Sequence, residues 1–464
     1  MSFFIRDKQS KGKRPKKEEK KKRTSSEVQK AKRKYEETIG AHEKHTIENS
    51  DDDEAEGATS SDEDLAETTQ EKKLRLAKKY LEEIERQEKE RAESKEIDRS
   101  VIESRLKHDL LEESGKIHKC VADNYIGYDE DNISILTCKD HKLPVTCLVI
   151  SADNQYVYSA SKDCVIVKWS LKEKKKLKAT PHFKKCSEEL KDKCHQHRIL
   201  SLSVSTDGEY LASGDEGKII IIWNADTLQH IRTFTGHKGP ITGLAFRKET
   251  HQLFSASSDR SVKYWSLDEM SCIETLFGHQ SPITAIDALS RERAVTAGGR
   301  DTSIRVWKIV EESQLVFNGH RGSIDCVKLL DEQRFISGGD DGVVSVWSAM
   351  KKKPLCSVVD THGKDTASNE PNWVCSVAAY LNTDLTASGS RNGKIMLWKS
   401  GQGFRTLESM FHIPIKGFIN GLAFTSDGRH LIAAVGQEHR LGRWWRDASV
   451  KNSVVVIPLK QKTS

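Results

Sequence analysis

An eleven-residue phrase that ends in tryptophan recurs seven times, and no other feature of the chain constrains its fold as strongly. The closing tryptophans are separated by 54, 42, 42, 40, 51 and 46 residues. Such a period predicts one small supersecondary unit that is repeated, with each copy burying its apolar face against its neighbours. The copies are SASKDCVIVKW (159–169), SGDEGKIIIIW (213–223), SASSDRSVKYW (255–265), AGGRDTSIRVW (297–307), SGGDDGVVSVW (337–347), SGSRNGKIMLW (388–398) and the most degenerate one, AVGQEHRLGRW (434–444).

Each copy has the pattern of a short antiparallel sheet. Apolar and small residues alternate in ITGLAF (241–246) and LFSASS (253–258), which is the period of a strand. A Gly-His pair precedes several copies, and His237 and His279 each lie 22 residues before an aspartate. This combination is typical of a WD-repeat blade. We therefore expect an all-β fold, a seven-bladed WD-repeat β-propeller, at residues 116–464.

Three copies contain a full set of His, Ser, Asp and Trp, which we expect to form a buried hydrogen-bond chain in each blade. The indole would donate to the serine, the serine to the imidazole, and the imidazole to the carboxylate. The same residue types occur in hydrolase triads, but a pattern repeated in several blades indicates a scaffold, so we predict no catalytic residue. The sets are His141, Ser159, Asp163 and Trp169; His237, Ser255, Asp259 and Trp265; and His320, Ser337, Asp341 and Trp347.

Four copies are predicted to lack a member of this tetrad. Gly217 stands in place of Asp in the second copy, Ala297 in place of Ser in the fourth, and Asn392 in place of Asp in the sixth. In the last copy, Ala434 and His439 replace Ser and Asp. Closure of the ring has two alternatives, because two segments suit the outer strand of the last blade: ISILTC (133–138) and SVVVIP (453–458).

Cysteine usage indicates a reduced, intracellular protein. The ten cysteines include no CxxC pair. One cluster has residue types that bind zinc, but its spacing matches no standard finger, so an inserted loop is the favoured interpretation and no metal or cofactor is expected. We expect His197 to occupy the same blade position as His141. The cluster comprises His182, Cys186, Cys194, His195 and His197.

No apolar run approaches the length of a membrane span, so no membrane partner is expected. The N-terminus becomes charged after MSFFI, which does not fit a signal peptide.

Residues 1–70 are predicted to be a disordered, basic-then-acidic arm. Residues 1–47 carry 16 Lys or Arg against 7 Asp or Glu, whereas residues 48–70 carry ten acidic residues and no basic one. The basic block is interpreted as a nuclear or nucleolar address or a nucleic-acid arm, with a merely solvated tail as the alternative. Three serines have an acidic residue three positions later and are candidate phosphorylation sites: Ser50, Ser60 and Ser61.

Residues 71–115 are predicted to be a charged helical segment, because apolar residues recur there at helical spacing. We expect two helices, or one broken helix, that dock on the propeller or on a partner. The two apolar stripes are Leu74, Ala77, Leu81 and Ile84, and then Ile97, Val101, Ile102, Leu106 and Leu110.

The expected propeller is basic, with 47 Lys or Arg against 39 Asp or Glu at residues 116–464. One concentration is the insertion at 171–198, with ten basic and four acidic residues. The other lies in loops beside the repeated His and Asp, which open on one face. A basic ring there suits phosphate contacts and RNA recognition, and solubilising charge is the alternative. The ring comprises Lys142, Lys162, Lys238, Arg260, Arg300, Arg321, Arg391 and Arg440.

The stretch GQEHRLGRWWR (436–446) departs most from the repeat. We interpret Trp444 as the repeat tryptophan and Trp445 as the additional one. Arg443, Trp445 and Arg446, together with Arg440, suit a base-stacking or partner platform. The alternative is that Trp445 packs against a helix from residues 71–113.

The charged N-terminus, the seven repeats, SRNGKIMLWK (390–399), and GQEHRLGRWWR followed by NSVVVIPL (452–459) together resemble one family. It is the WD-repeat protein family of the U3 small nucleolar ribonucleoprotein, and the resemblance covers essentially the whole chain. It implies a non-catalytic scaffold that binds U3 small nucleolar RNA near its box B/C element, beside the small kink-turn-binding protein and other small-subunit processome proteins. It also implies that the protein is located in the nucleus and nucleolus, and that it acts in pre-ribosomal RNA processing for the small ribosomal subunit.

Two other classes remain as alternatives. A WD-repeat substrate receptor of a ubiquitin ligase often has Trp-Asp-x-Arg after a repeat, and no repeat tryptophan here is followed by Asp. A chromatin-associated scaffold that reads histone tails would present an acidic face, whereas the expected loop ring is mainly basic.

Overall fold

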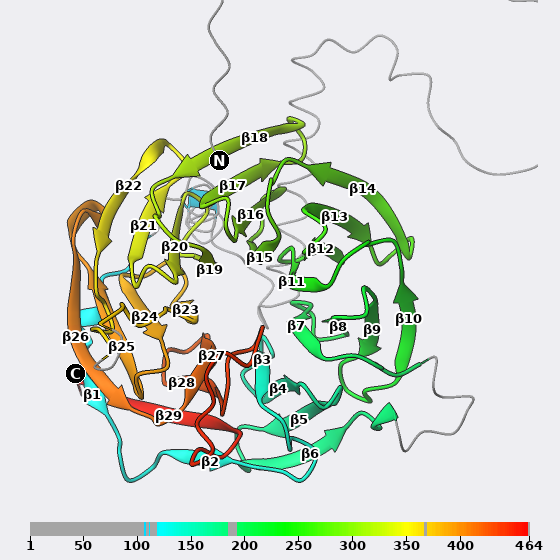
Figure 1. Cartoon of the computed structure of the whole chain (residues 1–464), viewed down its shortest axis with the longest axis horizontal. Coiled ribbons are helices and arrows are strands. Elements are labelled where there is room, and N and C mark those ends of the chain that lie inside the picture. The colour runs from blue at the N-terminus through cyan, green and yellow to red at the C-terminus, as the bar shows by residue number, and fades with distance from the viewer. Residues whose placement is uncertain (1–105, 108–110, 112–117, 184–192, 366–368, 463–464) are drawn as a thin grey trace, which may run out of the picture. The chain divides into compact units, whose positions relative to one another are not determined.

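The structure is a computed structural model that describes residues 106–107, 111, 118–183, 193–365 and 369–462. Its strands form seven antiparallel sheets around a central channel, which confirms the seven-bladed all-β propeller (Figure 1). The predicted arm at 1–70, with Ser50, Ser60 and Ser61, lies outside the described residues. Only three residues of the segment at 71–115 are described, too few to test its predicted helices.

Six blades consist of four consecutive strands each, with the first strand nearest the channel (Figure 1). Blades one to three are β3 (Val145–Ile150), β4 (Tyr156–Ser161), β5 (Ile166–Ser170) and β6 (Lys175–Ala179); β7 (Ile199–Val204), β8 (Tyr210–Asp215), β9 (Ile220–Asn224) and β10 (His230–Phe234); and β11 (Ile241–Phe246), β12 (Gln252–Ser257), β13 (Ser261–Ser266) and β14 (Ser271–Phe277). Blades four to six are β15 (Ile283–Ala288), β16 (Arg293–Gly298), β17 (Ser303–Lys308) and β18 (Ser313–Asn318); β19 (Ile324–Leu329), β20 (Arg334–Gly339), β21 (Val344–Ser348) and β22 (Lys351–Val358); and β23 (Ser376–Ala379), β24 (Leu385–Gly389), β25 (Lys394–Ser400) and β26 (Leu407–Pro414).

Blade seven joins the two ends of the propeller. Its inner strands are β27 (Phe418–Phe424), β28 (His430–Gly436) and β29 (Ser453–Gln461), and two N-terminal strands pair with the outer edge of β29. These are β1 (Tyr125–Tyr128) and β2 (Ser134–Leu136), and a short 3-10 helix, η2 (Ala122–Asn124), precedes them. Among the described residues, a further short 3-10 helix is η4 (Gln402–Phe404). ISILTC therefore contributes to the outer edge, whereas SVVVIP belongs to the third strand.

A ring of hydrogen bonds joins the innermost strands around the channel. Near the start of each innermost strand, a polar side chain donates to a carbonyl at the start of the next blade; examples are Thr146 Oγ1 to Ile199 O at 2.7 Å and Thr284 Oγ1 to Ile324 O at 2.6 Å. Each bond links the innermost strand of one blade to the backbone of the next blade. Seven donors complete the ring: Thr146, Ser201, Thr242, Thr284, Cys326, Ser376 and Asn420.

The tetrad geometry is complete in blade three. Trp265 Nε1 donates to Ser255 Oγ at 2.8 Å, Ser255 Oγ lies 2.8 Å from His237 Nε2, and His237 Nδ1 lies 2.9 Å from Asp259. The carboxylate also accepts the backbone N–H of Lys238, and so fixes the loop before the blade. In blade five the same contacts join His320, Ser337, Asp341 and Trp347.

Blade one departs from its expected tetrad. Trp169 and His141 both contact Ser159 at 2.8 Å, but Asp163 accepts the backbone N–H of Leu143 instead of contacting the imidazole. Among the described residues, His141 Nδ1 has no hydrogen-bond partner. Burial lowers the pKa of His141 to about 4, which keeps the ring neutral.

Blades two and four contain complete sets that the sequence interpretation missed. In blade two His195, not His197, contacts Ser213 at 2.6 Å and Asp215 at 2.9 Å, so Gly217 is not the position of the missing aspartate. His197 is exposed. Because His195 belongs to this buried tetrad, it is not available to the zinc cluster considered from the sequence. Cys186 of that cluster lies outside the described residues.

In blade four Thr296, not Ala297, occupies the serine position. Its hydroxyl lies 2.8 Å from His279 and accepts the indole N–H of Trp307 at 2.8 Å, while His279 Nδ1 lies 2.8 Å from Asp301. The assignment of Ala297 was wrong because a threonine hydroxyl serves as well as serine here.

Blade six retains the geometry with an amide. His362 contacts Ser388 at 2.9 Å and Asn392 at 3.3 Å, and Trp398 donates to Ser388 at 2.8 Å. Burial lowers the pKa of His362 to about 4, and the uncharged amide of Asn392 opposes this effect only in part.

Blade seven has no tetrad, and its third strand is not the phrase that ends at Trp444. Leu431 of β28 pairs with Ile457 of β29, at the register where the other blades pair with their tryptophan. Ala433, not Ala434, faces the serine register. The interpretation of Trp444 as the repeat tryptophan was therefore wrong, since residues 437–452 form a long connection between β28 and β29.

Candidate nucleic-acid interface

The loops beside the tetrads open on one face, which we call the loop face. It is formed by the connections between the second and third strands of each blade and by those that enter the next blade. Five of the predicted ring residues are exposed there: Lys142, Lys238, Arg260, Arg300 and Arg321. Two exposed cations follow in the connection of blade seven: Arg443 and Arg446.

Lys162 does not belong to an exposed ring. Its side chain is 3% exposed, and its ammonium donates to Glu438 Oε1 and to His439 O, both at 2.8 Å. Burial lowers the pKa of Lys162, although Glu438 opposes that effect. Lys162 therefore attaches the connection of blade seven to blade one. Its predicted place in an exposed basic ring was wrong, because its ammonium is buried and paired.

Arg440 also lies inside the molecule. Its guanidinium donates to the carbonyls of Thr284 at 2.9 Å and Asp325 at 2.8 Å, in the innermost strands of blades four and five. It lines a cavity of about 130 Å³ in the central channel. Burial raises the pKa of the neighbouring Asp325 to about 7, against the opposing charge of Arg440. Arg440 thus anchors the connection across the channel, and its prediction as a surface contact was wrong.

The connection of blade seven reaches toward the middle of the ring (Figure 1). Asn420 holds its start, because Asn420 Oδ1 accepts the N–H of Arg440 at 3.0 Å and Asn420 Nδ2 donates to Glu438 O at 3.0 Å. Glu438 accepts Arg443 Nε at 2.7 Å on its second oxygen. Burial alone would raise the pKa of Glu438, but Lys162 and Arg443 outweigh it and lower that pKa.

Three tryptophans meet on the loop face beside this anchor. The Trp373 ring lies 4.7 Å from that of Trp445 and 5.8 Å from that of Trp444, both at steep interplanar angles. The guanidinium of Arg391 lies 4.1 Å from the Trp445 ring and contacts Asp365 at 2.7 Å. Trp445 and Arg391 are half-buried, whereas Trp444 is 59% exposed. The described contacts of Trp445 are with the propeller, and the helix that was its alternative partner lies outside the described residues.

Trp373 and Glu438 were not singled out from the sequence. Trp373 belongs to no repeat phrase and comes from the connection between blades five and six. A signal was present for Glu438: it is the acidic residue within a stretch that otherwise breaks the repeat. Its lysine partner lies 276 residues away, which no local pattern reveals.

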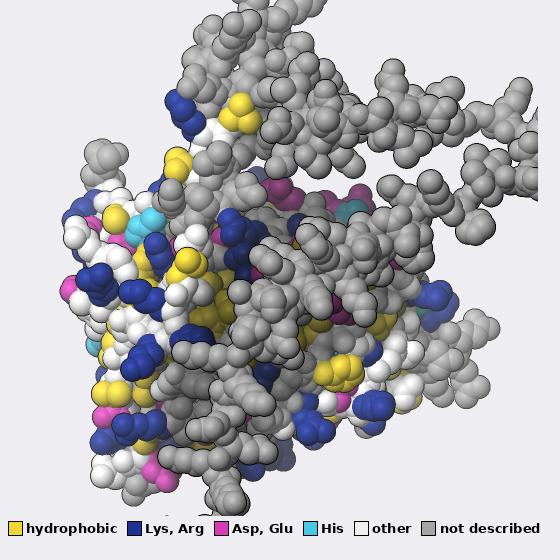
Figure 2. Space-filling view, turned by 90° about the horizontal axis from the view of Figure 1, so that it is seen from above, with side chains coloured by type: hydrophobic (Ala, Val, Ile, Leu, Met, Phe, Trp, Pro, Cys, Tyr) yellow, Lys and Arg dark blue, Asp and Glu magenta, His cyan; other side chains and the backbone are white. Residues whose placement is uncertain are grey.

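Basic side chains also occur away from the loop face. The described part of the insertion contains β6, in which Lys175, Lys176 and Lys178 are exposed, while Lys184 and Lys185 lie outside the described residues. Figure 2 shows Lys and Arg spread over the visible rim, with no single continuous basic patch. On the side visible in Figure 2, charge alone does not mark one binding site.

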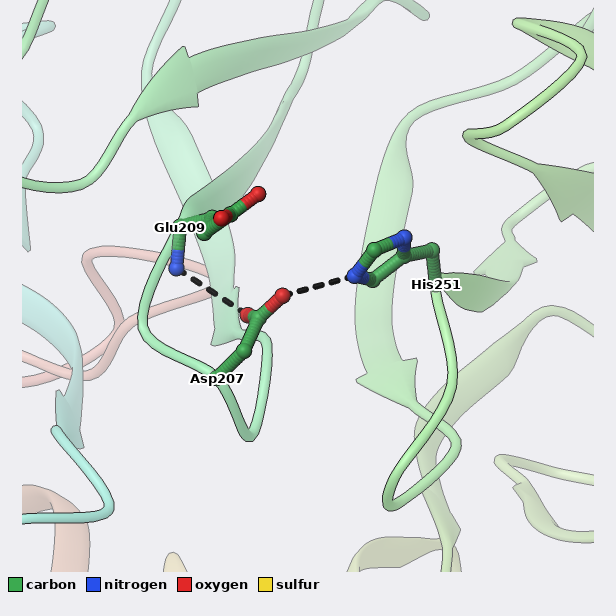
Figure 3. A group of neighbouring side chains, drawn as sticks. All are labelled: Asp207, Glu209 and His251. Carbon is green, nitrogen blue, oxygen red and sulfur yellow. Dashed lines mark hydrogen bonds and ion pairs between the residues drawn. The ribbon is translucent and has the colours of Figure 1, made fainter.

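One group of side chains on the opposite face has metal-binding residue types. Asp207, Glu209 and His251 lie close together at the turn before β8 and the start of β12 (Figure 3). Both imidazole nitrogens of His251 are already bonded to carboxylates, at 2.6 Å to Asp207 and 2.7 Å to Asp268. These bonds raise the pKa of His251, Asp268 first. Both ring nitrogens are engaged by carboxylates in this arrangement.

Within the described ranges, no helix combines the length and the apolar composition that crossing a bilayer requires.

The fold and the repeated tetrads define a WD-repeat propeller. The WD domain, G-beta repeat model matches residues 228–266, 270–308 and 311–348, and the IP5P C-F beta-propeller model matches residues 114–236. The chain is 55% identical over 397 residues to U3 small nucleolar RNA-interacting protein 2 of Mus musculus. The aligned residues cover 85% of this chain and 83% of that protein.

The likeness extends to a distant relative and to a solved structure. Ribosomal RNA-processing protein 9 of Saccharomyces cerevisiae is 26% identical over 553 residues, covering 93% of this chain and 96% of that protein. The crystal structure of RRP9 WD40 repeats is 50% identical, with a TM-score of 0.69, and covers 72% of this chain and 99% of that one. The chain belongs to the U3 small nucleolar RNA-interacting protein family.

Proposed function

We propose that this chain is a non-catalytic, RNA-binding scaffold of the U3 small nucleolar ribonucleoprotein and acts in pre-ribosomal RNA processing. Membership of the family supports the particle and the process. The observation that carries RNA binding is the loop face, where exposed cations from several blades share one face with an aromatic group on a fixed connection. Backbone phosphates favour such an array of Lys and Arg.

The repeated Ser-His-Asp sets support a scaffold and not an enzyme. Ser255 and Ser337 are fully buried, and each hydroxyl is already engaged by an indole N–H and an imidazole. A serine nucleophile needs access to a substrate carbonyl, which these side chains do not have.

The proposal extends to partners and location. We place the box B/C region of U3 small nucleolar RNA on this chain, beside the small kink-turn-binding protein and other processome proteins, in the nucleolus. Crosslinking the protein to RNA in cells and sequencing the attached RNA tests this directly. The expected result is enrichment of U3 RNA near box B/C, and enrichment of unrelated RNA alone would contradict it.

The loop face is tested by charge reversal. Replacing Lys238, Arg300 and Arg321 with Glu should weaken binding of U3 RNA and reduce the log–log salt slope by roughly 0.7 to 0.9 for each lost contact. Arg391 is left intact because it supports Trp445. The matched control reverses three exposed lysines at the start of β22: Lys351, Lys352 and Lys353. Equal losses from both triple variants would contradict a role for the loop face.

The basic block is tested by deletion of residues 1–47. We expect reduced nuclear or nucleolar accumulation and an unchanged melting temperature of the propeller, since the block has little apolar content. A truncated protein that still concentrates in nucleoli would show that the block is not the address.

A further inference from the structure

We propose that the central channel contains a binding site for an alkylammonium group, and that its ligand is a lysine side chain of a partner protein. The site consists of the carboxylate of Asp325 and the apolar wall of the channel beneath it. It lies inside the ring and not on the loop face, so the inference goes beyond RNA binding and does not depend on it.

The cavity of about 130 Å³ in the channel has an apolar wall. Each blade contributes one apolar side chain to it, one or two residues after the blade's donor in the hydrogen-bond ring. The wall therefore lies farther from the loop face than that ring. Because one water needs roughly 10 to 15 Å³, the cavity has room for a chain of several atoms. The side chains of the wall are Leu148, Leu202, Leu244, Ile286, Val327, Val377 and Leu422.

Asp325 places a carboxylate without a partner at the end of the cavity nearest the loop face. The residue is 6% exposed and lines the cavity. Arg440 donates to its backbone carbonyl at 2.8 Å, and within the described part of the chain no hydrogen bond or ion pair reaches the side-chain oxygens. A buried carboxylate without a partner is costly, and a ligand that brings a cation removes that cost.

The fold does not use the Asp325 side chain to join its blades. Asp325 occupies the irregular position at the start of β19, where the innermost strands of blades three and four have Thr242 and Thr284. Those hydroxyls donate to the carbonyl of the next blade, which an ionised carboxylate cannot do. In blade five the thiol of Cys326 makes that contact instead. The carboxylate is therefore available to a ligand.

The charges around Asp325 favour a cationic ligand over an anionic one. Burial raises the pKa of Asp325 to about 7; Arg440 opposes this effect, and the carboxylates of Asp340 and Asp341 add to it. Arg440 spans the loop-face end of the cavity and is fixed by the carbonyls of Thr284 and Asp325. A ligand therefore enters from the opposite face and meets Asp325 at the end of its path.

A lysine side chain matches both parts of the site. Its methylene stem suits the apolar wall, and its compact ammonium suits a single carboxylate. No other free charge faces the stem among the described lining residues, because Lys328 is paired with Asp287 at 2.9 Å. Burial raises the pKa of the thiols of Cys326 and Cys375, which keeps them neutral.

The test titrates the full-length chain with acetyl-lysine methylamide and with acetyl-norleucine methylamide, which has the same carbon stem and no ammonium. Chemical shifts of the methyl groups in the wall measure binding inside the channel. The lysine probe should bind with an affinity on the order of millimolar. Asp325→Asn should weaken it roughly tenfold or more, the effect of losing a hydrogen bond between charged groups, and leave the norleucine probe unchanged.

The stability of Asp325→Asn separates a binding role from a structural one. Because the substitution removes a buried charge that has no partner, the melting temperature should stay at the wild-type value or rise. Asp131→Asn, in the exposed turn between β1 and β2, is the matched control and should change neither binding nor stability. A clear fall in the melting temperature of Asp325→Asn would show that the carboxylate supports the fold and would overturn the site.

A pH series on the wild-type chain tests the same site without a variant. The lysine probe binds the ionised carboxylate, so its affinity should rise about tenfold for each pH unit below the folded pKa of Asp325, about 7, and level off above it. The norleucine probe should show no such dependence. An affinity for the lysine probe that does not change with pH would overturn the role of Asp325.

Spermidine distinguishes the two sources of an alkylammonium group, a protein side chain and a free polyamine. It should bind more weakly than the lysine probe, because its further charges would lie against the apolar wall. Tighter binding of spermidine through Asp325 would overturn the assignment to a partner protein. If no probe shifts the methyl groups of the wall, the cavity holds only water and the proposal fails.

Discussion

Blades three and seven hold their loops on the same face by different means. In blade three the contacts stay within the blade: Asp259 binds His237 and the backbone N–H groups of Lys238 and Ser261. In blade seven the connection is held by other blades, through Lys162 of blade one and the carbonyls that accept Arg440. The repeated tetrad fixes a short turn, and loss of the tetrad allows a long connection that carries new side chains.

The largest effect is expected where blade seven depends on its neighbour. Glu438→Ala should lower the free energy of unfolding by about 3 to 5 kcal/mol, because it leaves the buried ammonium of Lys162 unpaired. Denaturant unfolding measures this. Replacing Lys162 and Glu438 together with Met should recover most of the loss, since no charge then remains buried. A Glu438→Ala protein as stable as wild type would contradict the ion-pair anchor.

A smaller effect is expected within blade three. Asp259→Ala should cost about 1 to 3 kcal/mol, because it leaves His237 Nδ1 without its acceptor. Asn392→Ala should cost less, since its contact with His362 is longer and uncharged. Asp163→Ala should also cost less, because Asp163 does not contact His141. Equal losses of melting temperature in the three variants would show that the tetrads do not differ in the way described.

The stability contributed by Asp259 should also depend on pH in the acid range. Burial raises the pKa of Asp259, but the bonds from His237 and Ser261 outweigh it and hold the pKa well below its usual range. A depressed folded pKa gives stability that is present above the unfolded value, about 4, and is lost as pH falls through the folded value. Stability of the wild type should therefore fall toward that of Asp259→Ala in acid, which unfolding at several pH values measures.

The smallest effect is expected on the opposite face, at His251. Bonds to Asp268 and Asp207 raise its pKa, so its contribution is fully present below the unfolded value of about 6.5 and is lost as pH rises through the folded value. The difference in stability between wild type and His251→Gln should be less than about 1 kcal/mol, as for exposed ion pairs, and should vanish in alkali. A difference that grows with pH would contradict the assignment.

The fold was predictable because each short repeated phrase identifies one strand of a blade, and the number of phrases gives the number of blades. Each tryptophan phrase marks a third strand, and six of the seven are placed as expected. The errors arose where spacing was applied too rigidly: Asp215 follows its serine by two residues instead of four, and Thr296 substitutes for serine.

The candidate site was less predictable, because burial depends on partners distant in sequence. Lys162 and Arg440 have the composition of exposed loop residues, and only the ring geometry brings Glu438 and the channel carbonyls to them. The exposure of Trp444 and the half-burial of Trp445 have the same cause. Trp373, which contacts both rings, lies about 70 residues earlier and in no recognisable motif.

Closure of blade seven by both ends of the propeller sets the order in which the propeller can fold during synthesis. Tyr125 pairs with Gln461, so the ring stays open on the ribosome until β29 has been synthesised. Blades one to six are built from consecutive strands and can form as they emerge, whereas β1 and β2 must wait for β29. During that interval the apolar face of blade one that packs against β28 and β29 is exposed to other chains, as are the waiting strands β1 and β2. Multi-strand proteins are prone to misassembly in such a period. A chain shortened before β29 would carry every tetrad described above and still have no means of closing.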